Sequence, residues 1–211
     1  MFQVFVDSAA NLPAATAKKY DIHVVSFVNL VNGKELVCFD PDLTPEEERA
    51  KGKEYYNAMR SGAEIKTGLI STANFEDAFR TALAAGEDVI YFSLSKNISG
   101  NYNSARLAAE ELLEEYGDKR KIRLVDSLNA SLAQGILAIY ATEMRDKGMD
   151  VDDAADLLET YVGRMNGVFT VGDLKYLSHT GRIKGSVAVV GNMLKIKPIL
   201  RGNKDGYIVS Y

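Results

Sequence analysis

Short apolar runs alternate with helix-like patterns along most of the chain. Residues 2–6, 89–94 and 122–125 are rich in β-branched and aromatic residues, and a polar loop follows each run, as is typical of buried strands. Between residues 75 and 83, apolar residues recur three and four positions apart, which indicates one buried face of a helix. The repeated order of strand, loop and helix predicts an α/β fold, a parallel sheet with helices on both faces.

Turn and capping signals place further elements. Residues 24–31 and 36–39 are mostly apolar and flank Asn32-Gly33, the pair that most strongly favours a two-residue hairpin turn. Thr44-Pro45-Glu46-Glu47 combines a capping box with proline at the first helical position, and it predicts a helix to about Arg60. The remaining helices are expected over these approximate ranges: residues 11–20 with Asn11 as the cap, 71–86, a helix that ends near 116, 131–147 and 151–165.

The pattern changes near residues 163–167, which predicts a domain boundary there. Residues 1–163 are expected to form one α/β domain, and residues 164–211 the start of a second α/β domain. In the second part we predict an apolar helix over residues 187–194 and two strands around the turn Asp205-Gly206. Because the chain stops within an apparent strand at Tyr211, we expect this second domain to be incomplete at its C-terminus.

Composition and charge exclude several classes of protein. The net charge of −4, with Lys and Arg scattered among Asp and Glu, offers no basic surface for a nucleic acid. One cysteine, Cys38, and two histidines can form neither an internal disulfide nor a Cys/His zinc cluster. No apolar run approaches the ~18 residues of a membrane span. We therefore expect a cytoplasmic protein with no metal, no cofactor and no stable membrane insertion.

Polar residues follow each of three predicted strands directly. These residues are Asp7-Ser8, the segment 95–99 and Asp126-Ser127, and the segment 66–71 adds a fourth polar stretch before a helix. The carboxyl ends of parallel strands meet at one edge of a sheet, where ligands of such sheets bind. The sequence therefore predicts that these loops converge at one edge.

The stretch SLSKNISGNYNSARLAAEEL, residues 93–112, places the richest of these loops immediately before a helix. Gly100 lets the backbone approach a ligand closely, while Ser95, Ser99 and Asn101 supply hydrogen-bond donors. The N-terminus of a helix also has unpaired N–H groups and a partial positive charge, which suit a phosphate or a carboxylate. Ser and Asn are equally ordinary helix caps, so capping and ligand binding both remain open.

Other catalytic patterns are weak or absent. The sequence has no dinucleotide-binding GxGxxG, no Walker A motif and no GxSxG. Ser99 and Asp126 have no histidine near them in sequence, which argues against a nucleophilic triad. His179 and Arg182, in SHTGRIKG, form either a basic corner that faces an anion or a polar turn.

Five segments taken together resemble the DegV family, whose studied members are FakB-type fatty-acid-binding subunits of bacterial fatty acid kinase. In chain order the segments are DSAANLP (7–13), SKNISGNYNSA (95–105), LVDSLNASLAQG (124–135), FTVGDLKYLSHTGRI (169–183) and LKIKPIL (194–200). The resemblance implies two α/β domains with an acyl chain buried between them.

The resemblance also implies a ligand site. Thr67 and Ser99 match the family's carboxylate-binding residues, and Arg182 matches an arginine near the pocket mouth and the kinase-facing surface. Gly68-Leu69-Ile70 departs from the Ser-Gln-Pro common in the family, and Asn101 replaces its usual threonine. The family continues beyond Tyr211, where a histidine normally completes the carboxylate site.

On this interpretation the protein is not an enzyme. It is a carrier whose ligand-binding residues are Thr67, Ser99, Gly100 and Arg182, and it presents a long-chain fatty acid to a separate fatty acid kinase catalytic subunit. The alternative is a binding protein or enzyme for a small phosphorylated metabolite at the same helix N-terminus. Apolar residues that could line the tunnel or belong to the plain core are Phe27, Phe92, Ile98, Met193 and Leu194.

Overall fold

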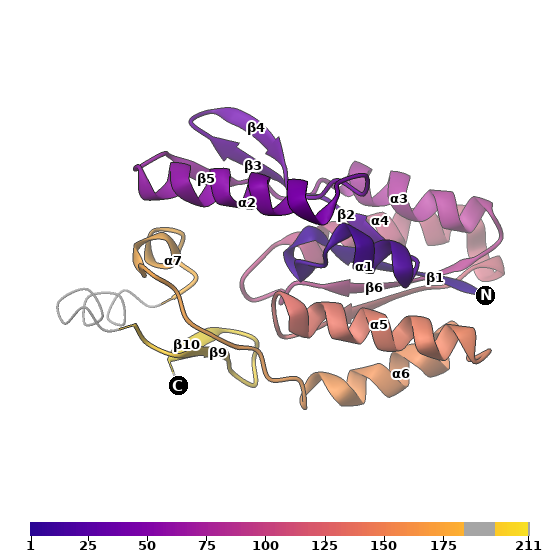
Figure 1. Ribbon diagram of the computed structural model, residues 1–211. Coiled ribbons are helices and arrows are strands. Elements are labelled where there is room, and N and C mark those ends of the chain that lie inside the picture. Colours follow the sequence, from indigo (N-terminus) through magenta and orange to yellow (C-terminus); the bar gives the residue numbers. More distant parts are fainter. Residues whose placement is uncertain (184–196, 211) are drawn as a thin grey trace.

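A computed structural model describes residues 1–183 and 197–210 of the protein (Figure 1). The helix predicted over residues 187–194, with the tunnel candidates Met193 and Leu194, lies outside the described residues. Three sheets are present in the described part of the chain, one parallel and two antiparallel.

The parallel sheet forms the centre of the larger part of the molecule and confirms the predicted fold class. Its strands, in spatial order, are β2 (Ile22–Val25), β1 (Phe2–Asp7), β6 (Asp88–Ser93) and β7 (Ile122–Asp126). All three pairings are parallel. The carboxyl ends of the strands therefore share one edge, which points toward the C-terminal part of the described chain (Figure 1).

Helices cover both faces of this sheet, as the sequence predicts. On one face lie α3 (Thr72–Ala84) and α4 (Asn101–Tyr116), and on the other α5 (Leu132–Asp146) and α6 (Val151–Val162). Successive strand residues alternate between the two cores: Val4 and Val6 pack with α5 and α6, whereas Phe5 packs with α3. Phe92 is fully buried in the α5–α6 core, so it belongs to the plain core.

The N-terminal helix differs from its prediction at the first turn. Asn11 does not cap it, because Asn11 has a left-handed backbone (φ 52°) at the end of the 3-10 turn η1 (Ser8–Ala10). Pro13 precedes the helix α1 (Ala14–Lys19), and the α1 Ala14 N–H donates to the Glu48 carboxylate at 2.8 Å. A side chain from a distant helix thus replaces the local cap. A second 3-10 turn, η2 (Gly117–Lys119), follows α4.

The second sheet is antiparallel and corrects one predicted strand. Its strands, in spatial order, are β4 (Lys34–Val37), β3 (Val28–Val31) and β5 (Ile65–Thr67), and the capping-box helix α2 (Pro45–Arg60) accompanies them as predicted. Residues 24–31 do not form one strand: the run breaks at Ser26 and Phe27, so β2 joins the parallel sheet and β3 joins this one. The Phe27 N–H donates to the Ser8 hydroxyl at 3.2 Å, and the Ser26 hydroxyl accepts two N–H groups of the segment after β4. These side-chain bonds replace strand pairing at the break.

The third sheet lies in the C-terminal part of the described chain. It contains β10 (Ile208–Ser210), β9 (Leu200–Gly202) and β8 (Val168–Phe169). The short helix α7 (Lys175–His179) lies between β8 and β9 in sequence. The predicted pair of strands around Asp205-Gly206 is confirmed, since β9 and β10 pair antiparallel. Among the described helices, none is long and apolar enough to cross a membrane.

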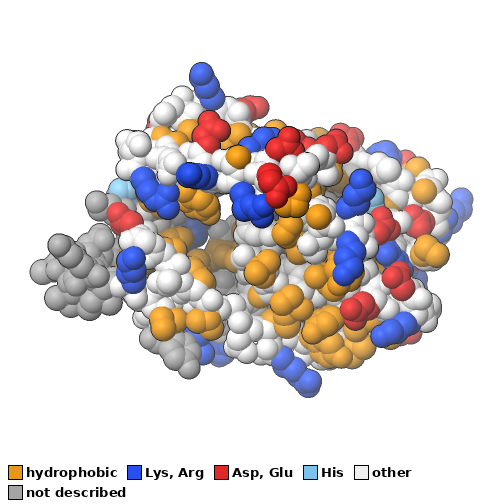
Figure 2. Space-filling view, viewed as in Figure 1, with side chains coloured by type: hydrophobic (Ala, Val, Ile, Leu, Met, Phe, Trp, Pro, Cys, Tyr) orange, Lys and Arg blue, Asp and Glu red, His pale blue; other side chains and the backbone are white. Residues whose placement is uncertain are grey.

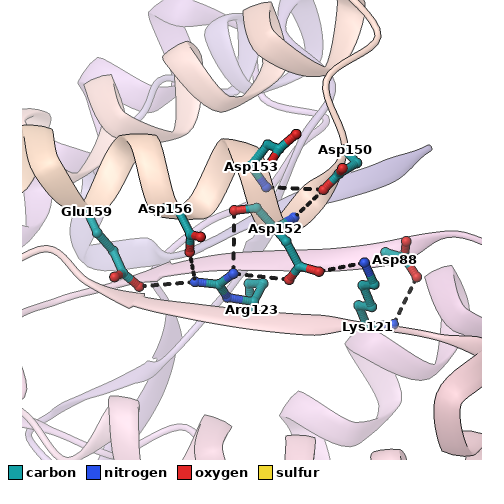
Figure 3. A network of polar contacts seen from close by, with 8 residues as sticks. All are labelled: Asp88, Lys121, Arg123, Asp150, Asp152, Asp153, Asp156 and Glu159. Carbon is teal, nitrogen blue, oxygen red and sulfur yellow. Dashed lines mark hydrogen bonds and ion pairs between the residues drawn. The ribbon is translucent and has the colours of Figure 1, made fainter.

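An ion-pair network attaches α6 to the edge strand β7 (Figure 3). The Arg123 guanidinium lies 3.0 Å from the Asp152 carboxylate, 2.6 Å from Asp156 and 3.5 Å from Glu159. Lys121 lies 2.5 Å from the second Asp152 oxygen. Hydrogen bonds from Lys121 and Arg123 lower the pKa of Asp152. The network lies at the start of β7, at the opposite end of the strand from the carboxyl edge of the sheet. It therefore stabilises the packing of α6 and takes no part in a site at that edge.

Candidate functional site

The loop between β6 and α4, residues 94–100, lies at the carboxyl edge of the parallel sheet and receives the other strand-end loops. The Leu94 N–H donates to the Asp7 carboxylate at 2.9 Å, and the Lys96 N–H donates to the Asp126 carboxylate at 3.3 Å. The predicted convergence of the three loops after β1, β6 and β7 is therefore confirmed. Two carboxylates at strand ends hold the central loop through its own backbone.

Asp7 is the buried anchor of this edge, a role that the sequence did not reveal. Its carboxylate also accepts a hydrogen bond from the Tyr91 hydroxyl at 2.7 Å and from the Ala9 N–H at 3.0 Å. Burial raises the pKa of Asp7, although these hydrogen bonds oppose the shift. Burial, and then the charge of Asp7, hold the pKa of Tyr91 well above its ordinary value. The sequence signals were a charged residue directly after an apolar strand and its place at the head of the segment DSAANLP.

The helix α4 begins at this loop with an open N-terminus. Gly100 is its N-cap and has no side chain with which to cap it, and its first turn has no acidic residue. The Ser99 hydroxyl accepts the Asn101 N–H at 3.2 Å, which leaves the hydroxyl proton of Ser99 free to be donated. The site thus offers a hydroxyl and unpaired backbone N–H groups in one place.

Thr67 comes from a different sheet and precedes a segment that packs on the start of α4. It is the last residue of β5, in the antiparallel sheet, so the fourth polar stretch does not follow a strand of the parallel sheet. Its loop nevertheless packs on α4: the Ile70 N–H donates to the Asn101 side-chain oxygen at 3.3 Å. A Cβ at Gly100 would lie 3.1 Å from a Leu69 methyl carbon, so only glycine allows this approach without displacing Leu69. Thr67 itself is exposed.

Ser95, predicted as a ligand donor, has another partner. Its buried hydroxyl donates to the Gly206 carbonyl oxygen at 2.9 Å, and the Asn97 side-chain amide donates to the Asp205 carbonyl oxygen at 2.6 Å. The β9–β10 turn therefore docks on residues 95–97. A hydroxyl has one proton to donate, and Ser95 uses it in the bond to Gly206. Ser95 therefore holds the C-terminal part of the described chain against the loop and does not donate to a ligand in this arrangement.

Arg182 lies against the same loop. Its Nε donates to the Ile98 carbonyl oxygen at 3.2 Å, and its side chain is exposed. Lys96 also lies at this edge, with its Nζ 3.7 Å from the Asp126 carboxylate, too far for a hydrogen bond. Two cationic side chains therefore accompany the positive end of α4, and the geometry suits an anion.

Three of the four predicted residues lie at or beside residues 94–100, and the fourth, Thr67, precedes a segment that packs there. Ser99 and Gly100 belong to the loop, Arg182 bonds to it, and Thr67 precedes the segment that packs over Gly100. Figure 2 shows the surface hollowed below α2, between the α7 region and the body of the parallel sheet. Apolar side chains accompany the donors: Leu69 is 61% exposed, and Ile98 is half-buried.

Two surface pockets lie elsewhere. One of about 490 Å³ lies between α5 and α6, and one of about 670 Å³ lies beside the edge strand β2. Neither is lined by any of the four predicted residues. In the described part of the chain, no group of three or more His, Cys, Asp or Glu side chains is placed to hold a metal ion.

Comparison with known sequences identifies relatives along the whole chain. The sequence model of the DegV family, described as a family of uncharacterised proteins, matches residues 1–211. A DegV domain-containing protein of Clostridium perfringens is 35% identical over 211 residues, which are all of this chain and 70% of that protein. The DegV domain-containing protein YteA of Lactococcus lactis is 32% identical over 97% of this chain and 68% of its own length.

Solved structures give the same result. A structure described as a stearic acid-binding protein from Eubacterium ventriosum is similar, with a TM-score of 0.84 and 28% identity over all of this chain and 70% of that one. A DegV family protein from Thermus thermophilus, described by its fatty acid binding, has a TM-score of 0.78, again with 28% identity and the same coverage.

Proposed function

The chain belongs to the DegV family, and we propose that it binds a long-chain fatty acid whose carboxylate lies at the N-terminus of α4. The observation that carries the proposal is the combination at that position of a helix start with unpaired backbone N–H groups, the Ser99 hydroxyl and the apolar side chains of Leu69 and Ile98. A ligand with one anionic end and a long apolar body matches this combination. The similar proteins from Eubacterium ventriosum and Thermus thermophilus, described as binding fatty acids, support the same ligand class.

In this proposal the polar residues orient the ligand and the acyl chain supplies most of the affinity. Thr67, Ser99 and the Gly100 backbone hold the carboxylate, and Arg182 lies at the mouth of the site. Burial of about 14 methylene groups contributes on the order of 11 kcal/mol before the costs of association and ordering are subtracted. The hydrogen bonds to the charged head group add about 1.5–3 kcal/mol each.

We further propose that the protein is a carrier and not an enzyme. Residues 1–163 form the first domain and residues 164–211 belong to a second, and the acyl chain lies between them. The carrier presents the carboxylate to a separate fatty acid kinase in the cytoplasm, which forms the acyl-phosphate with ATP. The carboxylate then needs a path to a partner protein, and the exposed side chain of Arg182 beside the loop suits that contact.

A second function rests on the same helix start. Lys96 and Arg182 lie near the N-terminus of α4, and two cations at a helix N-terminus also suit a small phosphorylated metabolite. The apolar side chains Leu69 and Ile98 have no role in that alternative, so the fatty acid is favoured.

The two ligand classes can be separated by what the protein carries when purified. The protein is denatured, and the released small molecules are analysed by mass spectrometry after lipid extraction and, in parallel, after aqueous extraction. We expect acyl chains in roughly one-to-one ratio with protein. If the aqueous extract contains phosphorylated metabolites and no acyl chain is found with any of several expression hosts, the fatty acid proposal is wrong and the metabolite alternative is favoured.

A further inference from the structure

Asn29 on β3 lies beside Thr67 in one cross-strand row of the antiparallel sheet. The strand register places Asn29 directly opposite Thr67 on β5 and opposite Leu36 on β4. Directly opposite residues of antiparallel strands point to the same face. The Asn29 side chain therefore shares its face with the Thr67 hydroxyl.

The type of this strand pair brings the two side chains close. The Gly68 N–H donates to the Val28 carbonyl oxygen at 2.8 Å, so the pair Val28–Gly68 is hydrogen-bonded. Pairs alternate along an antiparallel ladder, and the next pair, Asn29–Thr67, is of the non-hydrogen-bonded type. In that type the Cα atoms are only about 4.5 Å apart and the side chains are closer than in the other type.

The Asn29 side chain has an unexplained polar atom. Its amide oxygen is buried and has no hydrogen-bond partner among the described residues. Buried polar atoms without a partner are rare, and each one calls for an explanation. The NH₂ group at the end of the same side chain is a hydrogen-bond donor, and a carboxylate beside Thr67 accepts from such a donor.

We propose that Asn29 is a further head-group residue, whose amide nitrogen donates a hydrogen bond to the carboxylate that Thr67 holds. This inference rests on the proposed function and extends it by one residue. The carboxylate then lies between two surfaces, the Asn29–Thr67 row of the antiparallel sheet and the start of α4 at Ser99. Leu69 and the Ile70 N–H already join these two surfaces. Asn29 also makes the site selective for an ionised acid over an ester.

Two pairs of variants of the protein test this role. Asn29→Ala removes the amide, and Asn29→Ser is smaller than the parent residue but keeps a donor. Asn29→Asp adds a like charge beside the carboxylate, and Asn32→Asp is its matched control. Asn32 follows the other end of the same strand, and its side-chain oxygen accepts the Glu64 N–H at 2.9 Å, a bond that aspartate preserves.

The measurement is the dissociation constant for hexadecanoic acid and for its methyl ester, with the melting temperature of each variant alongside. We expect Asn29→Ala to bind the acid roughly ten- to hundredfold more weakly. Asn29→Ser should recover part of that loss, and Asn29→Asp should lose at least as much as Asn29→Ala. Binding of the ester should change less than about threefold in every variant, since the ester lacks the charge that strengthens the hydrogen bond. Asn32→Asp should match the parent.

Each other outcome overturns the inference. Unchanged acid binding in Asn29→Ala means that the amide does not reach the ligand. An equal loss for acid and ester, with a lower melting temperature, means that Asn29 only packs the sheet. A parent protein that binds neither probe would instead refute the proposed function, and the role of Asn29 would fall with it.

Discussion

The contact between the β9–β10 turn and the loop of residues 94–100 can be broken by one methyl group. Gly206 has a left-handed backbone (φ +81°), and its carbonyl oxygen accepts the Ser95 hydroxyl at 2.9 Å. A Cβ at Gly206 would overlap the Ser95 hydroxyl oxygen and lie 3.2 Å from the Leu128 Cα. Gly206→Ala must therefore displace the turn from residues 95–97 or distort both.

The free energy of this change has two parts. A left-handed backbone costs about 1–2 kcal/mol for a residue with a Cβ. The overlap with the buried Ser95 oxygen adds about 1–3 kcal/mol, the usual cost of overpacking. In a Ser95→Ala background the oxygen is absent, so Gly206→Ala retains chiefly the backbone cost. The two substitutions should therefore couple by about 1–3 kcal/mol, with the double variant more stable than the sum of the single effects predicts.

Urea unfolding of the parent, both single variants and the double variant measures this coupling. Gly62→Ala is the control, because Gly62 has a similar backbone (φ +86°) and no neighbouring atom within 4 Å of the place that an alanine methyl carbon would occupy. It should cost only the backbone part, about 1–2 kcal/mol. Affinity for hexadecanoic acid should fall in Gly206→Ala and not in Gly62→Ala, because residues 95–97 lead into Ser99. Effects of Ser95→Ala and Gly206→Ala that add to within about 0.5 kcal/mol would refute the contact.

Three further predictions concern other parts of the molecule. Ser99→Ala should cost about 1 kcal/mol of stability and weaken binding of a fatty acid at least tenfold while sparing its methyl ester; equal losses for both ligands would contradict the assignment. Asp152→Asn should be less stable than the parent at pH 7, because Lys121 and Arg123 lower the pKa of Asp152 in the folded state. That stabilisation is lost as pH falls through this lowered pKa, so the urea midpoints of the parent and of Asp152→Asn should converge below about pH 4. A difference between the two midpoints that stays constant with pH would contradict the prediction. Burial raises the pKa of Cys38 to about 11, so alkylation at pH 8 should be at least about tenfold slower than in the urea-unfolded chain, and equal rates would show an exposed thiol.

Elements with local signals could be predicted from the amino-acid sequence alone. The capping box at Thr44, the hairpin at Asn32-Gly33 and the buried face of α3 were predicted correctly, because each depends on residues within one or two turns of one another. The meeting of the strand-end loops was also predictable, since parallel strands necessarily place their carboxyl ends at one edge. The resemblance to the DegV family named Thr67, Ser99 and Arg182, and the fold brings Ser99 and Arg182 to one loop, while their role in binding stays a prediction.

The choice of sheet for each strand, and of partner for each hydroxyl, became visible only in the folded chain. Residues 24–31 contain two polar residues, Ser26 at the break and Asn29 within β3, so a polar residue does not by itself mark where the run divides. Ser95 and Ser99 look alike in sequence, yet the hydroxyl of Ser95 bonds to a turn more than a hundred residues later in the chain. Likewise, Asn29 becomes a neighbour of Thr67 only through strand register. Strand pairing, strand register and the docking of turns depend on contacts between segments that are far apart in the sequence. Local sequence patterns do not specify which distant segments meet.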